Sequence, residues 1–127
     1  MLTTLHDAGY KLLLFSNAQR LFTEPELRAL GIWDRFDHCY ISSDAGAQKP
    51  SSLFYGKMLE DCRVAPEKIL MVGNSPGDDI LPAAALGLCT CYIPSALTEK
   101  GAVRPTSTLF QPGPDMPALT QMLLNAR

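Results

Sequence analysis

Residues 68–79 read KILMVGNSPGDD, an apolar run that ends at a glycine and is followed by two adjacent acids. Apolar runs of this kind are typical of strands that are covered on both faces of a sheet. Gly73 lets another group approach the backbone closely, and Asn74 and Asp79 carry oxygen ligands of the type that Mg²⁺ prefers. The stretch therefore predicts a buried strand over 68–72 that delivers polar groups at its carboxyl end.

Strands and helices are expected to alternate along the rest of the chain. Further strands are predicted at 10–15, 37–43, 89–93 and 108–110, and helices at 1–8, 23–30, 51–62, 78–86 and 117–126. Glycines mark the ends of three of these helices, at Gly9, Gly31 and Gly87. Such alternation predicts an α/β fold, a mostly parallel sheet flanked by helices. The length fits a single domain, 1–127, with a loop-rich segment at 95–116.

The start of the helix at 23–30 is predicted from local signals. Thr23 and Glu26 have the spacing of a capping box, and Pro25 would lie in the first turn. We therefore expect the helix to begin at Thr23.

Two more polar segments follow predicted strands. Ser16 and Asn17 come directly after the strand at 10–15, and Lys49 lies in the loop after the strand at 37–43. Because ligands of parallel sheets bind beyond the carboxyl ends of the strands, we expect both segments to lie near 73–79. A hydroxyl, an amide and backbone N–H groups can together bind phosphate oxygens, and a lysine can neutralise their charge.

Each segment alone also has a simpler interpretation. Ser16 and Asn17 could cap the helix that follows them, and Lys49 could be an ordinary solvated side chain. Asp78 and Asp79 could be first-turn acids that complement a helix dipole. The individual segments leave these alternatives open.

Composition excludes several classes of partner. The chain has 11 Lys and Arg against 13 Asp and Glu, a formal net charge of −2, so no basic field is available for a nucleic acid or an anionic membrane. Its apolar runs are far shorter than the ~20 residues that span a bilayer. Residues 1–15 also lack the order of a signal peptide. We expect a cytoplasmic protein with no nucleic-acid or membrane partner.

Together the segments resemble motifs two, three and four of the haloacid dehalogenase-like hydrolases, a superfamily dominated by phosphatases. The matching patterns are strand-Ser-Asn at 16–17, Gly-x-x-Lys-Pro at 46–50 and apolar strand-Gly-Asn-x-x-x-x-Asp at 73–79. The resemblance extends from residue 1 to about residue 87. It implies a Rossmann-like core and a Mg²⁺-dependent phosphatase that acts on a small phosphorylated metabolite.

The resemblance also implies roles for individual residues. Ser16 and Asn17 would hold the substrate's phosphoryl group, and Lys49 would pair with that group and with the nucleophile. Asp79 and Asn74 would bind Mg²⁺, directly or through water. The family most often has aspartate where this chain has Asn74, and losing that charge predicts metal binding weaker by ~1–4 kcal/mol. A halide-releasing dehalogenase is disfavoured, because such chemistry does not need this metal-ligand pattern.

The nucleophile is the missing part of the resemblance. In the family it is the first aspartate of an Asp-x-Asp pair, on a strand that precedes these motifs and is usually followed by any cap domain. The 127 residues contain no Asp-x-Asp pair, and Asp7 precedes the strand at 10–15 rather than following it. We therefore expect a truncated or partial chain, the carboxyl-terminal portion of the core. Its activity alone should be very low, since deleting a nucleophile can cost on the order of 10⁶ in rate.

The same omission has a structural side. In the family's sheet the nucleophile strand lies between the strand ending at Ser16 and the strand ending at Val72. Its absence would leave two strand edges exposed, which favours self-association. Alternatively, the two neighbouring strands could pair directly in a smaller sheet. A non-catalytic member of the family, binding a phosphorylated ligand or a partner protein, is the alternative function.

Overall fold

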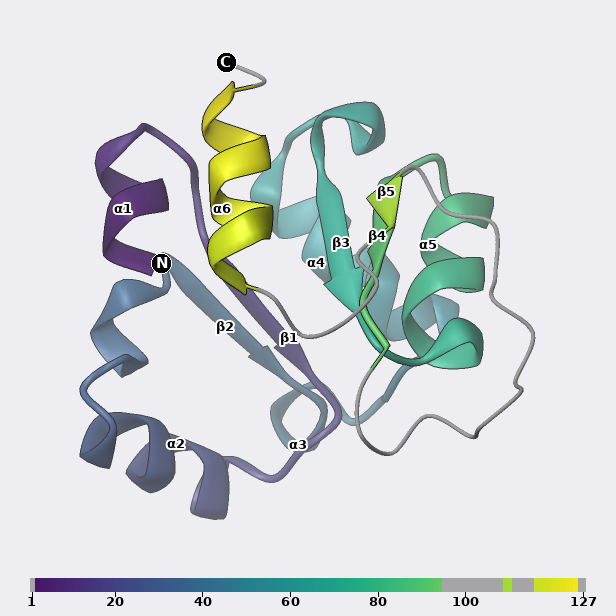
Figure 1. The fold of residues 1–127 in the computed structure, drawn as a ribbon. Helices are drawn as coiled ribbons and strands as arrows, with labels where there is room; N and C mark the ends of the chain where they lie inside the picture. Colours follow the sequence, from purple (N-terminus) through teal and green to yellow (C-terminus); the bar gives the residue numbers. More distant parts are fainter. Residues whose placement is uncertain (1, 95–108, 111–115, 126–127) are drawn as a thin grey trace. The chain divides into compact units, whose positions relative to one another are not determined.

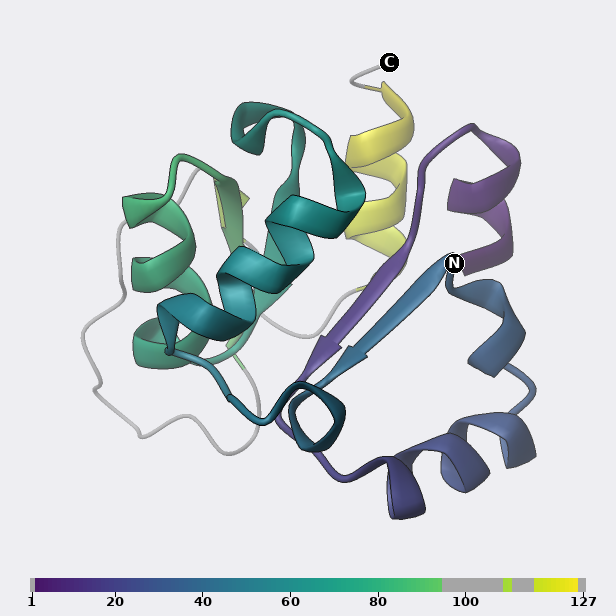
Figure 2. The same ribbon diagram turned by 180° about the vertical axis from the view of Figure 1, so that it is seen from behind.

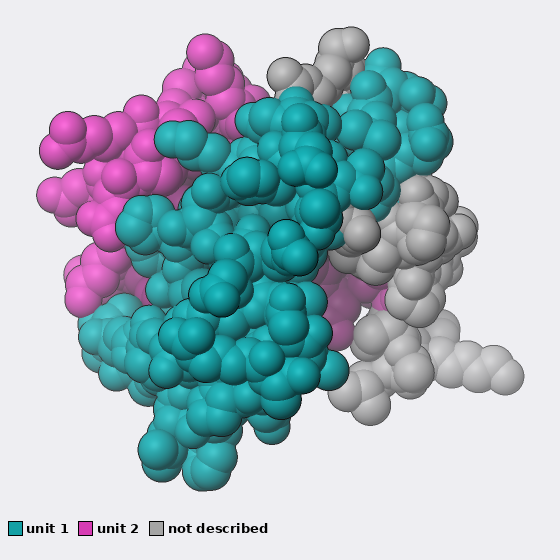
Figure 3. Space-filling view, turned by 90° about the vertical axis from the view of Figure 1, so that its left-hand side faces the viewer, with its two compact units in different colours: residues 1–48, 116–127 teal, residues 49–115 magenta. Residues whose placement is uncertain are grey.

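A computed structural model describes residues 2–94, 109–110 and 116–125 of the chain. The chain divides into two compact units: unit 1 comprises residues 1–48 and 116–127, and unit 2 comprises residues 49–115 (Figure 3). Each unit has its own parallel sheet (Figure 1). Most of the loop-rich segment predicted at 95–116 lies outside the described residues, and the single domain over 1–127 stays a prediction.

Unit 1 is built on two parallel strands, β1 (Leu13–Ser16) and β2 (His38–Ile41). Around them lie the helices α1 (Leu2–Asp7), α2 (Arg20–Ala29), α3 (Ser42–Ala45) and α6 (Met116–Asn125) and the 3-10 helix η1 (Trp33–Arg35). The last helix, α6, returns to lie beside α1 (Figure 1). The Tyr10 hydroxyl donates a 2.7 Å hydrogen bond to the Leu123 carbonyl of α6, so the end of the chain is tied to the segment that leads into β1.

An aromatic and charged cluster joins η1 to α2 in unit 1. The guanidinium groups of Arg20 and Arg28 lie 5.2 and 5.5 Å from the ring centroid of Trp33. Arg20 also forms ion pairs with Glu24 at 2.9 Å and Asp44 at 2.7 Å. The hydrogen bond to Asp44 is the main reason that the pKa of Arg20 is raised. These contacts fix the beginning of α2 against the segment after β2.

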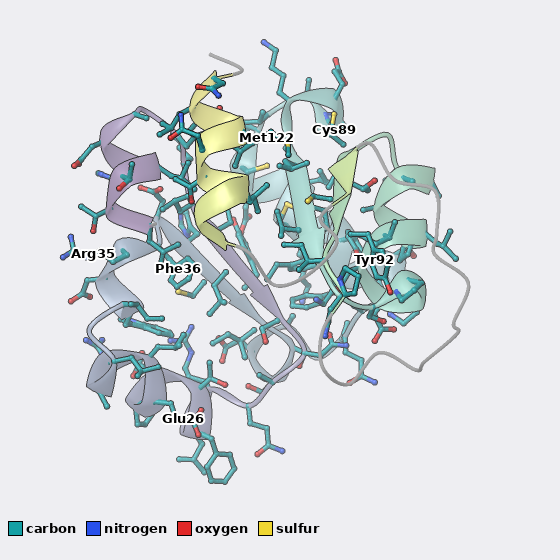
Figure 4. The ribbon with its side chains drawn as sticks, in the orientation of Figure 1. Glu26, Arg35, Phe36, Cys89, Tyr92 and Met122 are labelled. Carbon is teal, nitrogen blue, oxygen red and sulfur yellow. The ribbon has the colours of Figure 1, made fainter. Side chains whose placement is uncertain are left out.

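Unit 2 holds a three-stranded parallel sheet in the order β3 (Leu70–Gly73), β4 (Cys89–Tyr92) and β5 (Leu109–Phe110). Its helices are α4 (Ser52–Cys62), the 3-10 helix η2 (Pro66–Lys68), the π-helix η3 (Pro76–Ile80) and α5 (Leu81–Ala85). The rear view shows α4 crossing the unit in front of β3 (Figure 2). Ten of the 13 buried hydrophobic residues found in the described part of the chain belong to unit 2, and Tyr92 is one of them (Figure 4).

The predicted alternation of elements is confirmed. Each predicted strand has a counterpart within a few residues, and all pairs of described strands are parallel. The glycines predicted to end helices all have positive φ, at Gly9 (93°), Gly31 (73°) and Gly87 (89°). The α/β fold class inferred from the sequence therefore describes this chain.

The predicted start of α2 is wrong. The helix begins at Arg20 after Gln19 as N-cap, which places Pro25 inside the helix and not in its first turn. Glu26, labelled on α2 in Figure 4, consequently lies beyond the first turn and completes no capping box. The earlier start is supported by Arg20, whose N–H donates to the Ser43 hydroxyl at 3.0 Å and whose side chain pairs with Glu24.

Strand burial also differs from expectation. All four residues of β1 are partly exposed, although the run at 10–15 predicted a strand covered on both faces. A two-stranded sheet offers too little width for full coverage. Among the described strands, β1 pairs with β2 and β3 pairs with β4. Direct pairing of the strands ending at Ser16 and Val72 stays a prediction.

Candidate active site

The turn after β3 is folded around an acidic side chain. Ser75 is the N-cap of η3, and its hydroxyl accepts a 3.2 Å hydrogen bond from the Asp78 N–H. The backbone N–H of Ser75 in turn donates to Oδ2 of Asp79 at 3.2 Å. Asp79 is 5% exposed. The turn therefore directs one carboxylate inward, against the end of β3, and holds it there with a backbone hydrogen bond.

Gly73 makes room for that carboxylate. A Cβ at this position would lie 2.5 Å from both Cβ and Cγ of Asp79 and would overlap Oδ2 as well. Real Cβ atoms do not approach other atoms so closely, so a side chain here would displace either the strand end or the acid. The close approach predicted from the sequence at Gly73 is therefore confirmed.

Lys49 and Asp79 form a buried ion pair within unit 2. The Nζ atom of Lys49 lies 2.6 Å from Oδ1 of Asp79, and the two side chains are only 10% and 7% exposed. Burial of this kind is unusual for charged groups and is tolerated only when they are paired. The interpretation of Lys49 as an ordinary solvated side chain is therefore wrong.

Tyr55 is a site residue that the sequence did not reveal. This residue of α4 is fully buried, and its hydroxyl lies 2.7 Å from the carbonyl oxygen of Asp78 and 3.2 Å from that of Asp79. Burial, with smaller contributions from the Asp79 and Asp78 charges, raises the pKa of Tyr55 well above its usual value. The hydroxyl therefore stays protonated and acts as a donor.

The predicted phosphate-binding residues lie in unit 1. Ser16 is the last residue of β1 and is paired in register with Ile41. Asn17 follows it and lines a pocket of about 440 Å³. The remaining lining residues are Ala18, Gln19, Ser42, Ser43, Gly46, Ala47 and Gln48. Gln19 is the N-cap residue of α2, and its side chain makes no capping hydrogen bond. Neither Ser16 nor Asn17 is therefore the N-cap residue of this helix.

Ser42 holds one wall of this pocket in place. Its hydroxyl accepts a 2.8 Å bond from the Ala18 N–H and donates a 2.9 Å bond to the Ala18 carbonyl. The Ser43 N–H adds a 3.2 Å bond to the same carbonyl. The loop after β1 is therefore fixed to the start of α3, and the pocket presents amide and hydroxyl groups without a charged side chain among its lining residues.

The predicted metal ligands are only partly brought together. Asp79 lies inside η3, whereas Asn74 is exposed directly after β3. In the described part of the chain no group of three or more His, Cys, Asp or Glu side chains is arranged to hold a metal ion. Mg²⁺, however, is usually bound through one or two carboxylates and several waters. The residues fit that pattern.

The carboxylate of Asp79 keeps acceptor positions for such an ion. Its two oxygens offer about four acceptor positions, and the described residues use two of them, from Lys49 and Ser75. A hard cation bound there would share the carboxylate with the ammonium group.

No helix in the described residues has the length and apolar character needed to cross a membrane.

Comparisons with known proteins show which proteins this chain is similar to. The family model for haloacid dehalogenase-like hydrolases matches residues 1–87. A glyceraldehyde 3-phosphate phosphatase from Methanothermobacter thermautotrophicus is 34% identical over 98 residues, which is 77% of this chain and 43% of that protein. The pyrimidine 5′-nucleotidase YjjG from Escherichia coli is 29% identical over 101 residues, 78% of this chain and 45% of that protein. The chain thus spans less than half the length of these relatives.

Solved structures show the same fold. The crystal structure of a HAD phosphatase from Thermococcus onnurineus superposes with a TM-score of 0.77 at 25% identity. The match covers 96% of this chain and 54% of that one. The arrangement of parallel strands and helices is therefore that of the Rossmann-like core of this family.

Proposed function

Because the chain belongs to the haloacid dehalogenase-like hydrolases, we propose that it supplies the lysine and the Mg²⁺-binding acid of a phosphatase for a small phosphorylated metabolite. The observation that carries the proposal is the buried Lys49–Asp79 pair at 2.6 Å. A purely structural role does not require burying two charges, since apolar residues of similar size often serve stability equally well. The similarity to phosphatases supports this reaction class.

In this proposal each predicted residue has a separate task. Ser16 and Asn17 bind oxygens of the phosphoryl group through hydroxyl, amide and backbone N–H groups, and Lys49 neutralises charge on that group. Asp79 and Asn74 hold Mg²⁺, which when bound supplies the charge neutralisation that phosphoryl transfer needs. Lys49 would divide its charge between Asp79 and the phosphoryl oxygens. The related phosphatases are named for different substrates, so the metabolite itself is left open.

The nucleophile forms part of the proposal too. The 127 residues hold no Asp-x-Asp pair, and we propose that the attacking carboxylate comes from a segment outside them, so that the chain by itself turns over substrate very slowly. The DNA upstream of the first codon tests this directly. An open frame that encodes no Asp-x-Asp strand there contradicts the proposed truncation.

A non-catalytic protein that binds a phosphorylated ligand or a partner is the second candidate. It is favoured by one observation, the pocket of about 440 Å³ lined by amide and hydroxyl groups in unit 1, since neutral polar groups suit binding without turnover. The partner is a phosphorylated small molecule under the phosphatase proposal, and a phosphorylated ligand or a partner protein under the second candidate. Neither candidate involves a nucleic acid, and the expected location is the cytoplasm.

A chimaeric enzyme tests the phosphatase proposal. The part of the Methanothermobacter phosphatase outside the match would be joined to this chain, and hydrolysis of p-nitrophenyl phosphate would be measured with and without Mg²⁺. We expect Mg²⁺-dependent activity that falls at least about 10²-fold in Asp79→Ala and Lys49→Ala, since a positioned charge typically contributes that much. Asp61→Ala, an exposed acid on α4, is the matched control and should keep full activity.

The chain alone is assayed in parallel. Activity in the chain alone that Asp79→Ala removes would contradict both the missing nucleophile and the non-catalytic alternative. A folded chimaera without activity, in which the chain still binds inorganic phosphate, would favour the non-catalytic protein.

A further inference from the structure

We propose that Tyr55 is a positioning residue for Asp79, acting through a hydroxyl that fixes the backbone on which the acid is mounted. The inference rests on the proposed function, because there Asp79 is the metal ligand and the partner of Lys49. The hydrogen bonds that carry this role go to the main-chain carbonyl groups of Asp78 and Asp79, so Tyr55 acts on the acid through its backbone.

The Tyr55 hydroxyl shares its single hydrogen between two consecutive carbonyl groups. It lies 2.7 Å from the oxygen of Asp78 and 3.2 Å from that of Asp79, and the Tyr55 side chain is fully buried. A buried donor with no competing water holds its acceptors in a narrow range of positions. The two peptide groups on either side of the Asp79 Cα are therefore tied to α4, an element that is itself anchored by Phe54 and Met58 in the core.

The sequence explains why a donor is needed from outside the helix. In an α-helix the Asp78 carbonyl would accept a bond from the N–H four residues later. That residue is Pro82, in the first turn of α5, and proline has no N–H. The Tyr55 hydroxyl provides a hydrogen bond where Pro82 cannot, at the place where the π-helix η3 passes into α5.

The carboxylate is consequently held from two directions. On one side Ser75 and Lys49 bind its oxygens at 3.2 and 2.6 Å, and on the other Tyr55 fixes the peptide groups that carry it. Gly73 leaves no spare space at the strand end. Loss of the hydroxyl would free the peptide groups to shift, and the short Lys49–Asp79 contact would be the first geometry to change.

The experiment compares Tyr55→Phe with Tyr10→Phe. Both substitutions delete one hydroxyl whose hydrogen bond to a backbone carbonyl is 2.7 Å long, but Tyr10 belongs to unit 1 and Asp79 to unit 2. Circular dichroism first establishes that both variants are folded. Two readouts follow on the full chain: the ¹H–¹⁵N signal of the Lys49 ammonium group, and the Mg²⁺ dissociation constant by calorimetry.

We expect Tyr55→Phe to shift or broaden the Lys49 signal and to weaken Mg²⁺ binding about tenfold, as loss of a group supporting a metal ligand typically does. Tyr10→Phe should leave both unchanged. Identical Lys49 spectra in the two variants would overturn the proposal. So would an unchanged Mg²⁺ dissociation constant in Tyr55→Phe, or a Tyr55→Phe chain that does not fold, because the hydroxyl would then serve the fold as a whole.

The outcome separates this inference from the proposed function. The wild-type chain should bind Mg²⁺, and the Asp79→Ala variant should not. A wild-type chain that binds no Mg²⁺ would contradict the metal role of Asp79. The Lys49 signal would then decide the positioning role of Tyr55 alone, since the ion pair does not depend on the metal.

Discussion

The Lys49–Asp79 pair is the most deeply buried ion pair among the described residues. Removing only the lysine leaves a buried carboxylate without its cation, which costs about 3–5 kcal/mol in comparable cases. We therefore predict that Lys49→Met lowers the free energy of unfolding by about 3 kcal/mol, measured by urea denaturation.

The double variant Lys49→Met/Asp79→Asn is the matched control for that prediction. It removes both charges and keeps the shape of the acid, so most of the lost stability should return. A double variant as unstable as Lys49→Met would show that the lysine stabilises unit 2 by packing and not by its charge.

Gly73 and Gly77 form a natural pair for testing the close approach at the end of β3. A Cβ at Gly73 would overlap the Asp79 carboxyl, whereas a Cβ at Gly77 would meet no atom within 4 Å. Gly73→Ala should lower the free energy of unfolding by about 1–3 kcal/mol, the usual cost of overpacking. Gly77→Ala, inside η3, should be neutral or stabilising by up to about 1 kcal/mol. Equal effects on thermal unfolding would contradict the contact.

For single residues, the sequence predicted a role best where the residue type serves few structural purposes. Gly73 predicted a close approach of another group to the backbone, and Lys49 with Pro50 matched the Gly-x-x-Lys-Pro pattern of the family. Tyr55 was not predicted as a site residue because its aromatic ring also suits an ordinary core position. Only the structure shows which carbonyl groups its hydroxyl contacts. The one available signal was Pro82, which stands four residues after Asp78 and removes a helix donor.

The end of α4 carries a local strain. Its C-cap residue, Arg63, has φ 51° and ψ 35°, a left-handed conformation that glycine adopts at lower cost. We predict that Arg63→Gly raises the free energy of unfolding by about 0.5–1 kcal/mol. Arg63→Ala keeps a Cβ and is the control, expected within about 0.5 kcal/mol of wild type. A destabilised glycine variant in urea denaturation would mean that the Arg63 side chain contributes more than the strain costs.

The number and type of the helices and strands were predicted better than the residues at which they begin and end. The start of α2 was misplaced because Thr23, Pro25 and Glu26 resemble the beginning of a helix. Two of the contacts that support the true start, from Arg20 to Ser43 and Asp44, come from residues distant in sequence. The helix predicted at 78–86 begins earlier, as the π-helix η3, because Ser75 caps it. The short helix α3 has too few residues to show a period.

The core is unevenly divided between the two units. Unit 2 holds ten of the buried hydrophobic residues of the described chain, and unit 1 holds Leu5, Ile41 and Leu119. Regions with little buried apolar surface open at lower free energy. We predict that backbone amides of β1 and β2 exchange with solvent at least about tenfold faster than those of β3 and β4 in native-state hydrogen exchange.

The control for that comparison is exchange under strongly destabilising conditions, where both sheets should converge on global unfolding. Equal protection of the two sheets in native buffer would contradict the uneven division.

Self-association through strand edges stays a prediction, and it should appear as protection of β1 that grows with protein concentration.

Trp33 gives unit 1 an optical label of its own. It is the only tryptophan in the chain, and its ring lies close to the guanidinium groups of Arg20 and Arg28 in unit 1. Its emission therefore reports on that unit, whereas far-ultraviolet dichroism averages over all helices and strands. If unit 1 unfolds first, the fluorescence transition precedes the dichroism transition. A single unmodified sample can therefore show whether the chain unfolds in one step or two.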